Sequence, residues 1–335
     1  MPSHKERDLI ALQELCKTYP NGIQAVRDLS MEVAEGETVV LLGTSGSGKT
    51  TTMKMINRLI EPTSGKILID GEDIGRKSAI ELRRKIGYAI QHIGLFPHMT
   101  VGDNIAVVPR LLKWPTDEID QRVELLLKMV GLEPDEFRDR YPAQLSGGQR
   151  QRVGVARSLG ADPPLVLMDE PFGALDPITR EQLQDEFLEL ESEIQKTIVF
   201  VTHDIFEAVK MGDRVALLDA GRLQQLASPA ELVESPANEF VDSFLGQHRF
   251  QLSLLTRTVA TIEGLSKPRA AEAPKKKPRS YLRCRSSLVE ALDMFKTTKT
   301  DSLAVYDKQQ YVGHLEKSHL LNIITQALEE TGQQQ

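Results

Sequence analysis

One short stretch decides the fold of the first part of this chain: Gly43-Thr44-Ser45-Gly46-Ser47-Gly48-Lys49-Thr50. It matches the pattern G-x-x-x-x-G-K-S/T, in which glycines let backbone N–H groups wrap a phosphate and the following helix adds the positive end of its dipole. The apolar run Val39–Leu42 before it predicts a buried strand, and a helix should begin near Lys49. Because a phosphate loop needs this strand and helix around it, the context makes a chance match a poor alternative.

The side chains of this loop have separate predicted roles. The Lys49 ammonium group would reach the β- and γ-phosphates of ATP, and the Thr50 hydroxyl would bind Mg²⁺. The glycines would let the backbone approach the phosphates closely. The predicted nucleotide-binding residues of this region are Gly43, Thr44, Ser45, Gly46, Ser47, Gly48, Lys49, Thr50 and Thr51.

A second apolar run, Leu165–Met168, is followed directly by Asp169 and Glu170. Ligands of open α/β sheets gather at the carboxyl ends of the strands, where both carboxylates would emerge. Asp169 would hold Mg²⁺ through water, and Glu170 would orient and deprotonate an attacking water. Alone, this pattern could equally be a strand with a polar end. Together with the phosphate loop it predicts nucleotide hydrolysis.

A third element, Leu145-Ser146-Gly147-Gly148-Gln149, predicts a helix start with free N–H groups and therefore a second anion site. One ATP needs only one phosphate loop. The second site therefore implies contact with the γ-phosphate of ATP bound to a partner. A glycine-rich helix cap without a ligand is the alternative.

The order of patterns along the chain predicts its domains. Short apolar strands alternate with amphipathic helices over residues 1–245, which favours an α/β fold with a mostly parallel sheet. Residues from about 92 to 160 read as an inserted helical subdomain. Residues 246–279 are expected to form a linker, basic and proline-rich at 267–279. Residues 280–328 should form a small βαββα unit, with 329–335 as a tail.

Composition excludes several classes of protein. Apolar runs such as Val39–Leu42 are far shorter than the ~20 residues that a membrane span needs. The polar N-terminus does not have the pattern of a secretory signal. A net charge of −7 argues against a general nucleic-acid-binding protein. Cys16 and Cys284 are far apart in the sequence, form no metal-binding pair and are expected to be structural.

With these motifs in this order, residues 8–245 resemble an ATP-binding cassette (ABC) ATPase. The resemblance implies a P-loop NTPase of the ABC type, with a RecA-like core sheet, an antiparallel β subdomain and a helical subdomain. It also implies roles for four further residues. Tyr19 would stack on adenine, Gln91 would touch Mg²⁺ and the attacking water, Asp176 would lie in the D-loop, and His203 would contact the γ-phosphate.

The resemblance also implies partners. Two copies would pair head to tail, so that Ser146 and Gly148 of one face Lys49 and Glu170 of the other. Transport would need separate transmembrane permease subunits and a periplasmic or lipid-anchored solute-binding protein. The chain itself would be peripheral, on the cytoplasmic face of the inner membrane. No nucleic-acid partner is expected.

The stretch Ile86–Phe96 is similar to importers of osmoprotectants, namely glycine betaine, choline, carnitine or proline. A polar amino-acid importer is the alternative, and a soluble ABC ATPase without a transport role is the alternative from another class. Residues 280–328 resemble a single CBS motif where two are usual. Glu316 and His319 replace the ribose and phosphate contacts of nucleotide-binding CBS repeats, so the resemblance gives no support for nucleotide binding by this unit.

Overall fold

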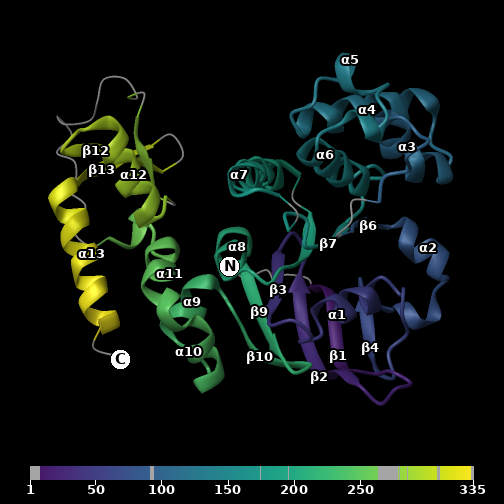
Figure 1. Cartoon of the computed structure of the whole chain (residues 1–335), viewed down its shortest axis with the longest axis horizontal. Helices are drawn as coiled ribbons and strands as arrows, with labels where there is room; N and C mark the ends of the chain where they lie inside the picture. Colours follow the sequence, from purple (N-terminus) through teal and green to yellow (C-terminus); the bar gives the residue numbers. More distant parts are fainter. Residues whose placement is uncertain are drawn as a thin grey trace, which may run out of the picture. The chain divides into compact units, whose positions relative to one another are not determined.

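The computed structural model of the chain describes residues 8–90, 94–173, 175–194, 196–262, 278, 280–284, 286–307 and 310–332. The chain divides into two compact units between Leu226 and Ala227 (Figure 1). Each unit has its own cluster of buried apolar side chains. The predicted ATPase domain ended later, at residue 245.

A six-stranded sheet forms the centre of the first unit, and its strand order is β10-β9-β3-β8-β7-β6. The pairs β9–β3, β3–β8, β8–β7 and β7–β6 are all parallel. Every residue of β3, β7 and β8 is buried, which explains their uninterrupted apolar runs. The predicted α/β fold is therefore confirmed. The strands are β3 (Thr38–Gly43), β6 (Ile86–Ala89), β7 (Leu165–Asp169), β8 (Thr197–Val201), β9 (Arg214–Asp219) and β10 (Arg222–Ala227).

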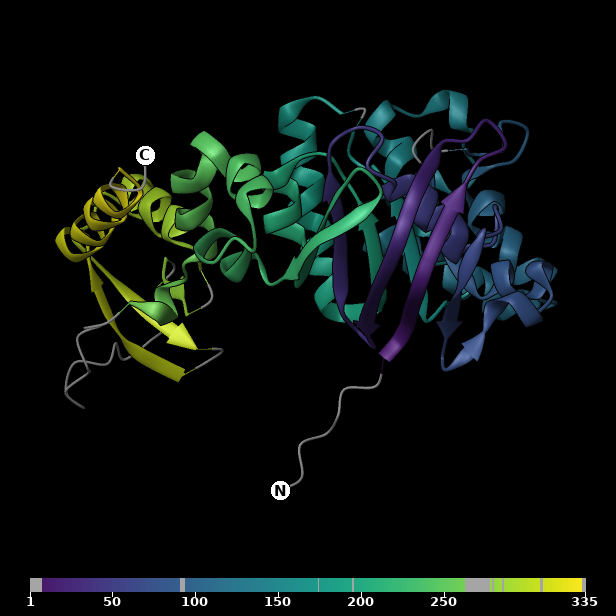
Figure 2. The same ribbon diagram turned by 90° about the horizontal axis from the view of Figure 1, so that it is seen from below.

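A second sheet of the first unit has the order β2-β1-β4-β5, and its strand pairs are antiparallel. Figure 2 shows the long purple strands β1 and β2 side by side. Buried and exposed residues alternate along the second half of β2, as expected for a sheet with one face on a core. The strands are β1 (Asp8–Thr18), β2 (Gln24–Ala34), β4 (Ser64–Ile69) and β5 (Glu72–Asp73).

The helices of the first unit include a group, α3 to α6, that follows β6 and precedes β7 in the chain and gathers in one place (Figure 1). This group lies within the predicted helical region, residues 92–160. Helix α1 packs against β3, β7 and β8. The helices are α1 (Lys49–Ile56), α2 (Ala79–Arg84), α3 (Val101–Leu111), α4 (Thr116–Met129), α5 (Pro134–Phe137), α6 (Gly147–Ser158), α7 (Pro177–Ile194) and α8 (Ile205–Met211), with short 3₁₀ turns at Ile74–Arg76 and Pro142–Gln144.

The second unit contains a three-stranded sheet of order β11-β12-β13, in which the first pair is parallel and the second antiparallel. Its elements from residue 282 onward follow the predicted order βαββα. Leu282, Phe295, Val305 and Leu320 form the centre of its core. The elements are α9 (Pro229–Glu234), α10 (Glu239–Leu245), α11 (Arg249–Thr256), β11 (Leu282–Arg283), α12 (Leu288–Thr298), β12 (Ser302–Asp307), β13 (Gln310–Glu316) and α13 (Lys317–Gly332), with 3₁₀ turns at Gly246–His248 and Val259–Thr261.

Residues 246–279 were predicted to form a linker, but the first part of this range is folded. Helix α11 occupies residues 249–256, and Leu252 and Val259 are fully buried. Helix α11 packs against α12 and α13, and Val259 joins the apolar core that they share, so the chain finds a partner surface that lies far away in the sequence. The basic residues predicted at 267–277 and 279 lie outside the described residues.

Within the described residues, no helix combines the length and the hydrophobicity that crossing a bilayer requires.

Gly87 allows helix α6 to lie close to strand β6, and this contact can be tested. A Cβ atom at Gly87 would lie 2.4 Å from the carbonyl oxygen of Ser158, a backbone atom that cannot rotate away. We expect Gly87→Ala to lower the free energy of unfolding of the first unit by about 1–3 kcal/mol. Trp114, the single tryptophan of the chain, reports this unfolding by fluorescence in urea. The control is Gly147→Ala, where the added Cβ meets open space and stability should change little.

Candidate active site

The phosphate loop connects the buried strand β3 to helix α1 through backbone contacts that only glycine permits. Gly43 has φ +148°, and a Cβ there would lie 2.1 Å from the carbonyl oxygen of Leu218. Gly48 has φ +100°, and a Cβ there would lie 2.5 Å from the carbonyl oxygen of Ala25. The loop is therefore held between backbone segments on both sides, which fixes the directions of its N–H groups.

Lys49 places a positive charge at the centre of this loop. Its Nζ donates hydrogen bonds to the carbonyl oxygens of Gly43 and Thr44, both at 2.8 Å. Burial lowers the pKa of Lys49, while the negative charges of Glu170 and Asp169 act in the opposite direction. The ammonium group is thus largely buried and bonded to two carbonyl oxygen atoms, a position from which it can pair with a phosphate.

Asp169 and Thr50 bring two oxygen atoms together from different elements. The Thr50 hydroxyl donates to Asp169 Oδ1 at 3.2 Å, as expected if both residues serve one cation. Burial raises the pKa of Asp169, and the hydrogen bond from Thr50 partly counteracts this. Over the described ranges, no group of three or more His, Cys, Asp or Glu side chains could hold a metal by itself. This pair suits Mg²⁺, which in proteins commonly combines one carboxylate with substrate phosphates and water.

Glu170 and His203 are in direct contact. His203 Nδ1 lies 3.1 Å from Glu170 Oε1, and the Glu170 backbone N–H donates to the carbonyl oxygen of Val201 at the end of β8. Glu170 has φ +45°, a left-handed conformation that costs a non-glycine residue about 1–3 kcal/mol. Such strained residues cluster at active sites. The sequence predicted a role for each side chain but not their contact.

A cavity of about 690 Å³ lies beside most of these groups. The loop residues 45–51, Glu170 and His203 line one part of it. Residues 23–25 and Arg27 line another part. Sequence reasoning did not predict them, because this segment is distant from the phosphate loop in the sequence and meets it only in the fold, where Ala25 lies beside Gly48. The Nε of Arg27 is buried and has no hydrogen-bond partner in the described part of the chain. A cavity of this size is typical of small-molecule sites.

Tyr19 lies beside the start of helix α1. Its hydroxyl is 3.5 Å from the hydroxyl of Thr51, and the Lys17 ammonium group is 5.5 Å from its ring centre. The half-buried ring is therefore close to the phosphate loop. Its stacking on adenine stays a prediction.

The segment Leu145–Gln149 begins helix α6 in the way the cap alternative describes. The Ser146 hydroxyl accepts from the Gln149 backbone N–H at 3.2 Å, and the Gln149 side chain accepts from the Ser146 N–H at 2.9 Å. None of these residues appears among the described residues that line the 690 Å³ cavity of the same chain. The cap reading is thus correct locally, and it does not conflict with contact to a partner's ATP.

Asp176 likewise has a local structural role. Its Oδ1 accepts from the backbone N–H of Thr179 at 3.1 Å, at the start of helix α7. Hydrogen bonds from Thr179 hold the pKa of Asp176 below its usual value. The neighbouring Ala174 and the predicted ligand Gln91 lie outside the described residues.

Comparisons with known proteins agree with this geometry. Residues 26–173 match the family described as ABC transporter. The chain is 50% identical over 310 residues to the glycine betaine/carnitine/choline transport ATP-binding protein OpuCA of Bacillus subtilis, covering 90% of this chain and 76% of that protein. The chain belongs to the ABC transporter family. A second relative of this ABC protein, the choline transport ATP-binding protein OpuBA of Bacillus subtilis, is 48% identical over 304 residues, 90% of this chain and 76% of OpuBA.

The fold of the ABC transporter family also appears in the structural comparison. A dimeric structure of the ATP-binding cassette MJ0796, described as a post-hydrolysis state bound to ADP and Pi, superimposes with a TM-score of 0.59 at 37% identity. The match covers 65% of this chain and 98% of the cassette. As an ABC ATPase, the chain binds ATP and hydrolyses it.

The role of Glu170 can be tested with Glu170→Gln, which keeps the size of the side chain but removes the base. We expect ATP binding to persist while hydrolysis falls about 10²-fold or more, because general-base catalysis contributes that much. Phosphate release and equilibrium nucleotide binding measure the two effects. Glu133→Gln changes an exposed residue outside the site and should leave both unchanged. Hydrolysis by Glu170→Gln near the wild-type rate would show that another group is the base.

Proposed function

We propose that this chain is the ATP-hydrolysing subunit of an importer for a quaternary amine or related osmoprotectant: glycine betaine, choline, carnitine or proline. The observation that carries the proposal is the length of the match to OpuCA. It covers 90% of the chain at 50% identity and so extends beyond residue 226 into the second unit. Both relatives are named for transport of molecules of this class.

The active form that we propose is a head-to-tail dimer. Each ATP would lie between the phosphate loop of one copy and residues 145–149 of the other. Two observations support this arrangement: residues 145–149 are absent from the described lining of the cavity, and MJ0796 is described as dimeric. Transmembrane permease subunits, and a periplasmic or lipid-anchored solute-binding protein, would complete the importer. The chain would lie on the cytoplasmic face of the inner membrane, without a nucleic-acid partner.

The residues of the site have distinct roles in the proposed hydrolysis. Glu170 takes a proton from the water whose oxygen attacks the γ-phosphorus, and the bond from this phosphorus to the β-γ bridging oxygen breaks to release ADP. His203, 3.1 Å from Glu170, orients its carboxylate and contacts the γ-phosphate. Lys49 offsets charge on the phosphates. Thr50 and Asp169 would hold Mg²⁺, which neutralises phosphate charge, and Gln91 is the further ligand that the family resemblance implies.

The transported solute can be identified from the assembled importer. The tagged chain is purified from its native membranes with its associated subunits and placed in lipid vesicles. We expect ATP-dependent uptake of labelled glycine betaine, choline, carnitine or proline, and loss of uptake with Glu170→Gln. Uptake of polar amino acids alone would favour the amino-acid importer instead. Recovery of the chain without membrane subunits would favour an ABC ATPase without a transport role.

The composite site can be tested by mixing two inactive variants, Lys49→Ala and Gly148→Asp. In a mixed dimer both changes fall in one ATP site, and the other site stays intact. We expect part of the ATPase activity to return on mixing, whereas each variant alone remains inactive. If residues 145–149 acted on the ATP of their own chain, no mixture would recover activity.

A further inference from the structure

The start of helix α6 is joined to the chain segment that carries Glu170. Gln151, on the second turn of α6, has an exposed fraction of only 7%. Its amide group donates a hydrogen bond to the carbonyl oxygen of Pro171, the residue directly after Glu170. The helix that begins with the partner-facing residues 146–149 therefore touches the catalytic segment of its own chain.

The backbone of Glu170 needs such support because of its left-handed conformation. Its N–H is bound to the Val201 carbonyl, and its own carbonyl accepts from the Gly173 N–H at 3.1 Å. The Pro171 carbonyl is the next polar group along the chain, and Pro171 is buried. Removal of the Gln151 donor would leave this carbonyl without its partner in a buried position, which favours a shift of the backbone beside Glu170.

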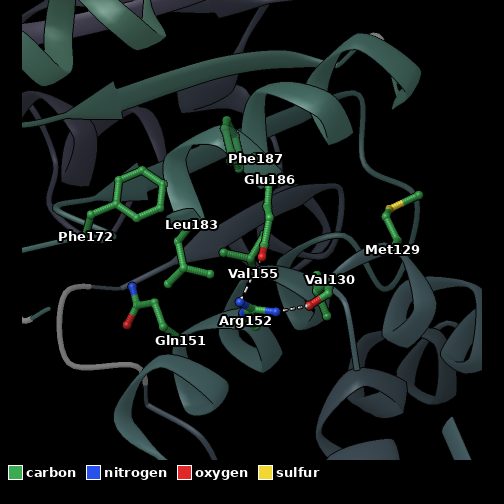
Figure 3. Close-up of a pocket in the computed structure, with 9 residues that line it drawn as sticks. All are labelled: Met129, Val130, Gln151, Arg152, Val155, Phe172, Leu183, Glu186 and Phe187. Atoms are coloured by element: carbon green, nitrogen blue, oxygen red, sulfur yellow. Dashed lines mark hydrogen bonds and ion pairs between the residues drawn. The ribbon is translucent and has the colours of Figure 1, made fainter. Parts of the chain in front are cut away.

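A second contact fixes α6 from the side. Arg152 Nη2 lies 3.0 Å from Glu186 Oε1 on α7, and Nη1 donates to the Val130 carbonyl oxygen at 3.2 Å (Figure 3). A cavity of about 30 Å³ lies between these groups and Phe172, enough for about one water molecule. The joint is thus not completely packed, and these polar contacts add to the apolar packing of α6 in holding its first turns in place.

We propose that Gln151 is a positioning residue for Glu170. In the head-to-tail dimer on which this inference rests, residues 146–149 contact the ATP of the partner, while Glu170 acts on the ATP of its own chain. The Gln151–Pro171 hydrogen bond then connects the two ATP sites of the dimer within each subunit. When α6 moves against the partner's ATP, this hydrogen bond shifts the segment that carries Glu170. The Glu170 carboxylate acts on the ATP of its own chain, so the two ATP sites are coupled.

A mixed dimer with one working ATP site can distinguish an effect of Gln151 on Glu170 from an effect on residues 146–149 of its own helix. One copy carries Gly148→Asp and supplies Lys49 and Glu170 to the working site. Its partner carries Lys49→Ala and supplies residues 146–149. Gln151→Leu is then added to either copy. In the Gly148→Asp copy we expect kcat to fall about tenfold with little change in the KM for ATP, because the reacting groups lose their alignment. In the other copy we expect mainly a rise in KM.

The matched control is Arg122→Leu in the Gly148→Asp copy. Arg122 donates to the Leu159 carbonyl at 2.8 Å and so supports the far end of the same helix. This variant should lower stability without lowering kcat. If Gln151→Leu does not fold, judged by Trp114 fluorescence, Gln151→Met removes the donor at nearly constant length. An unchanged kcat with Gln151→Leu or Gln151→Met would overturn the proposal. An inactive parent mixed dimer would overturn the composite site, and this inference with it.

Discussion

The pairing of strand β3 on both sides is the constraint on which the site depends. β3 lies between β8 and β9, all its residues are buried, and all these strands run in parallel. Their carboxyl ends therefore meet at one edge of the sheet. The phosphate loop follows β3, Glu170 follows β7, and His203 follows shortly after β8. Burial of apolar strands, rather than attraction between the polar groups, brings the catalytic side chains together.

Sequence reasoning predicted the parts of the site that lie within recognisable motifs. A Cβ atom at position 43 or 48 would lie 2.1 or 2.5 Å from a backbone carbonyl oxygen, so both positions require glycine. The G-x-x-x-x-G-K-S/T pattern contains both glycines. The Thr50–Asp169 pair was predicted through their shared role with Mg²⁺. The hydrogen bond between Glu170 and His203 was not predicted, because it depends on the register between β7 and β8.

Two further features could not be read from the sequence. Arg27 lines the nucleotide cavity because β2 passes beside the phosphate loop, and no local pattern distinguishes it from other arginines on strands. Residues 249–262 looked like part of a linker because their apolar partners, among them Leu282 and Phe295, lie across the basic segment. In both places the decisive contact joins segments that are distant in the sequence, and the secondary-structure propensity of neighbouring residues does not predict it.

The left-handed backbone of Glu170 means that the residue needed for hydrolysis also lowers the stability of the folded chain. Glycine adopts this conformation without the steric cost that a glutamate side chain imposes. At the position most important for hydrolysis, replacement of glutamate by glycine would therefore remove backbone strain from the folded chain. Laboratory selection for thermal resistance alone would drift toward inactive proteins here, so stabilising changes to this subunit should be sought elsewhere in the sheet or in the second unit.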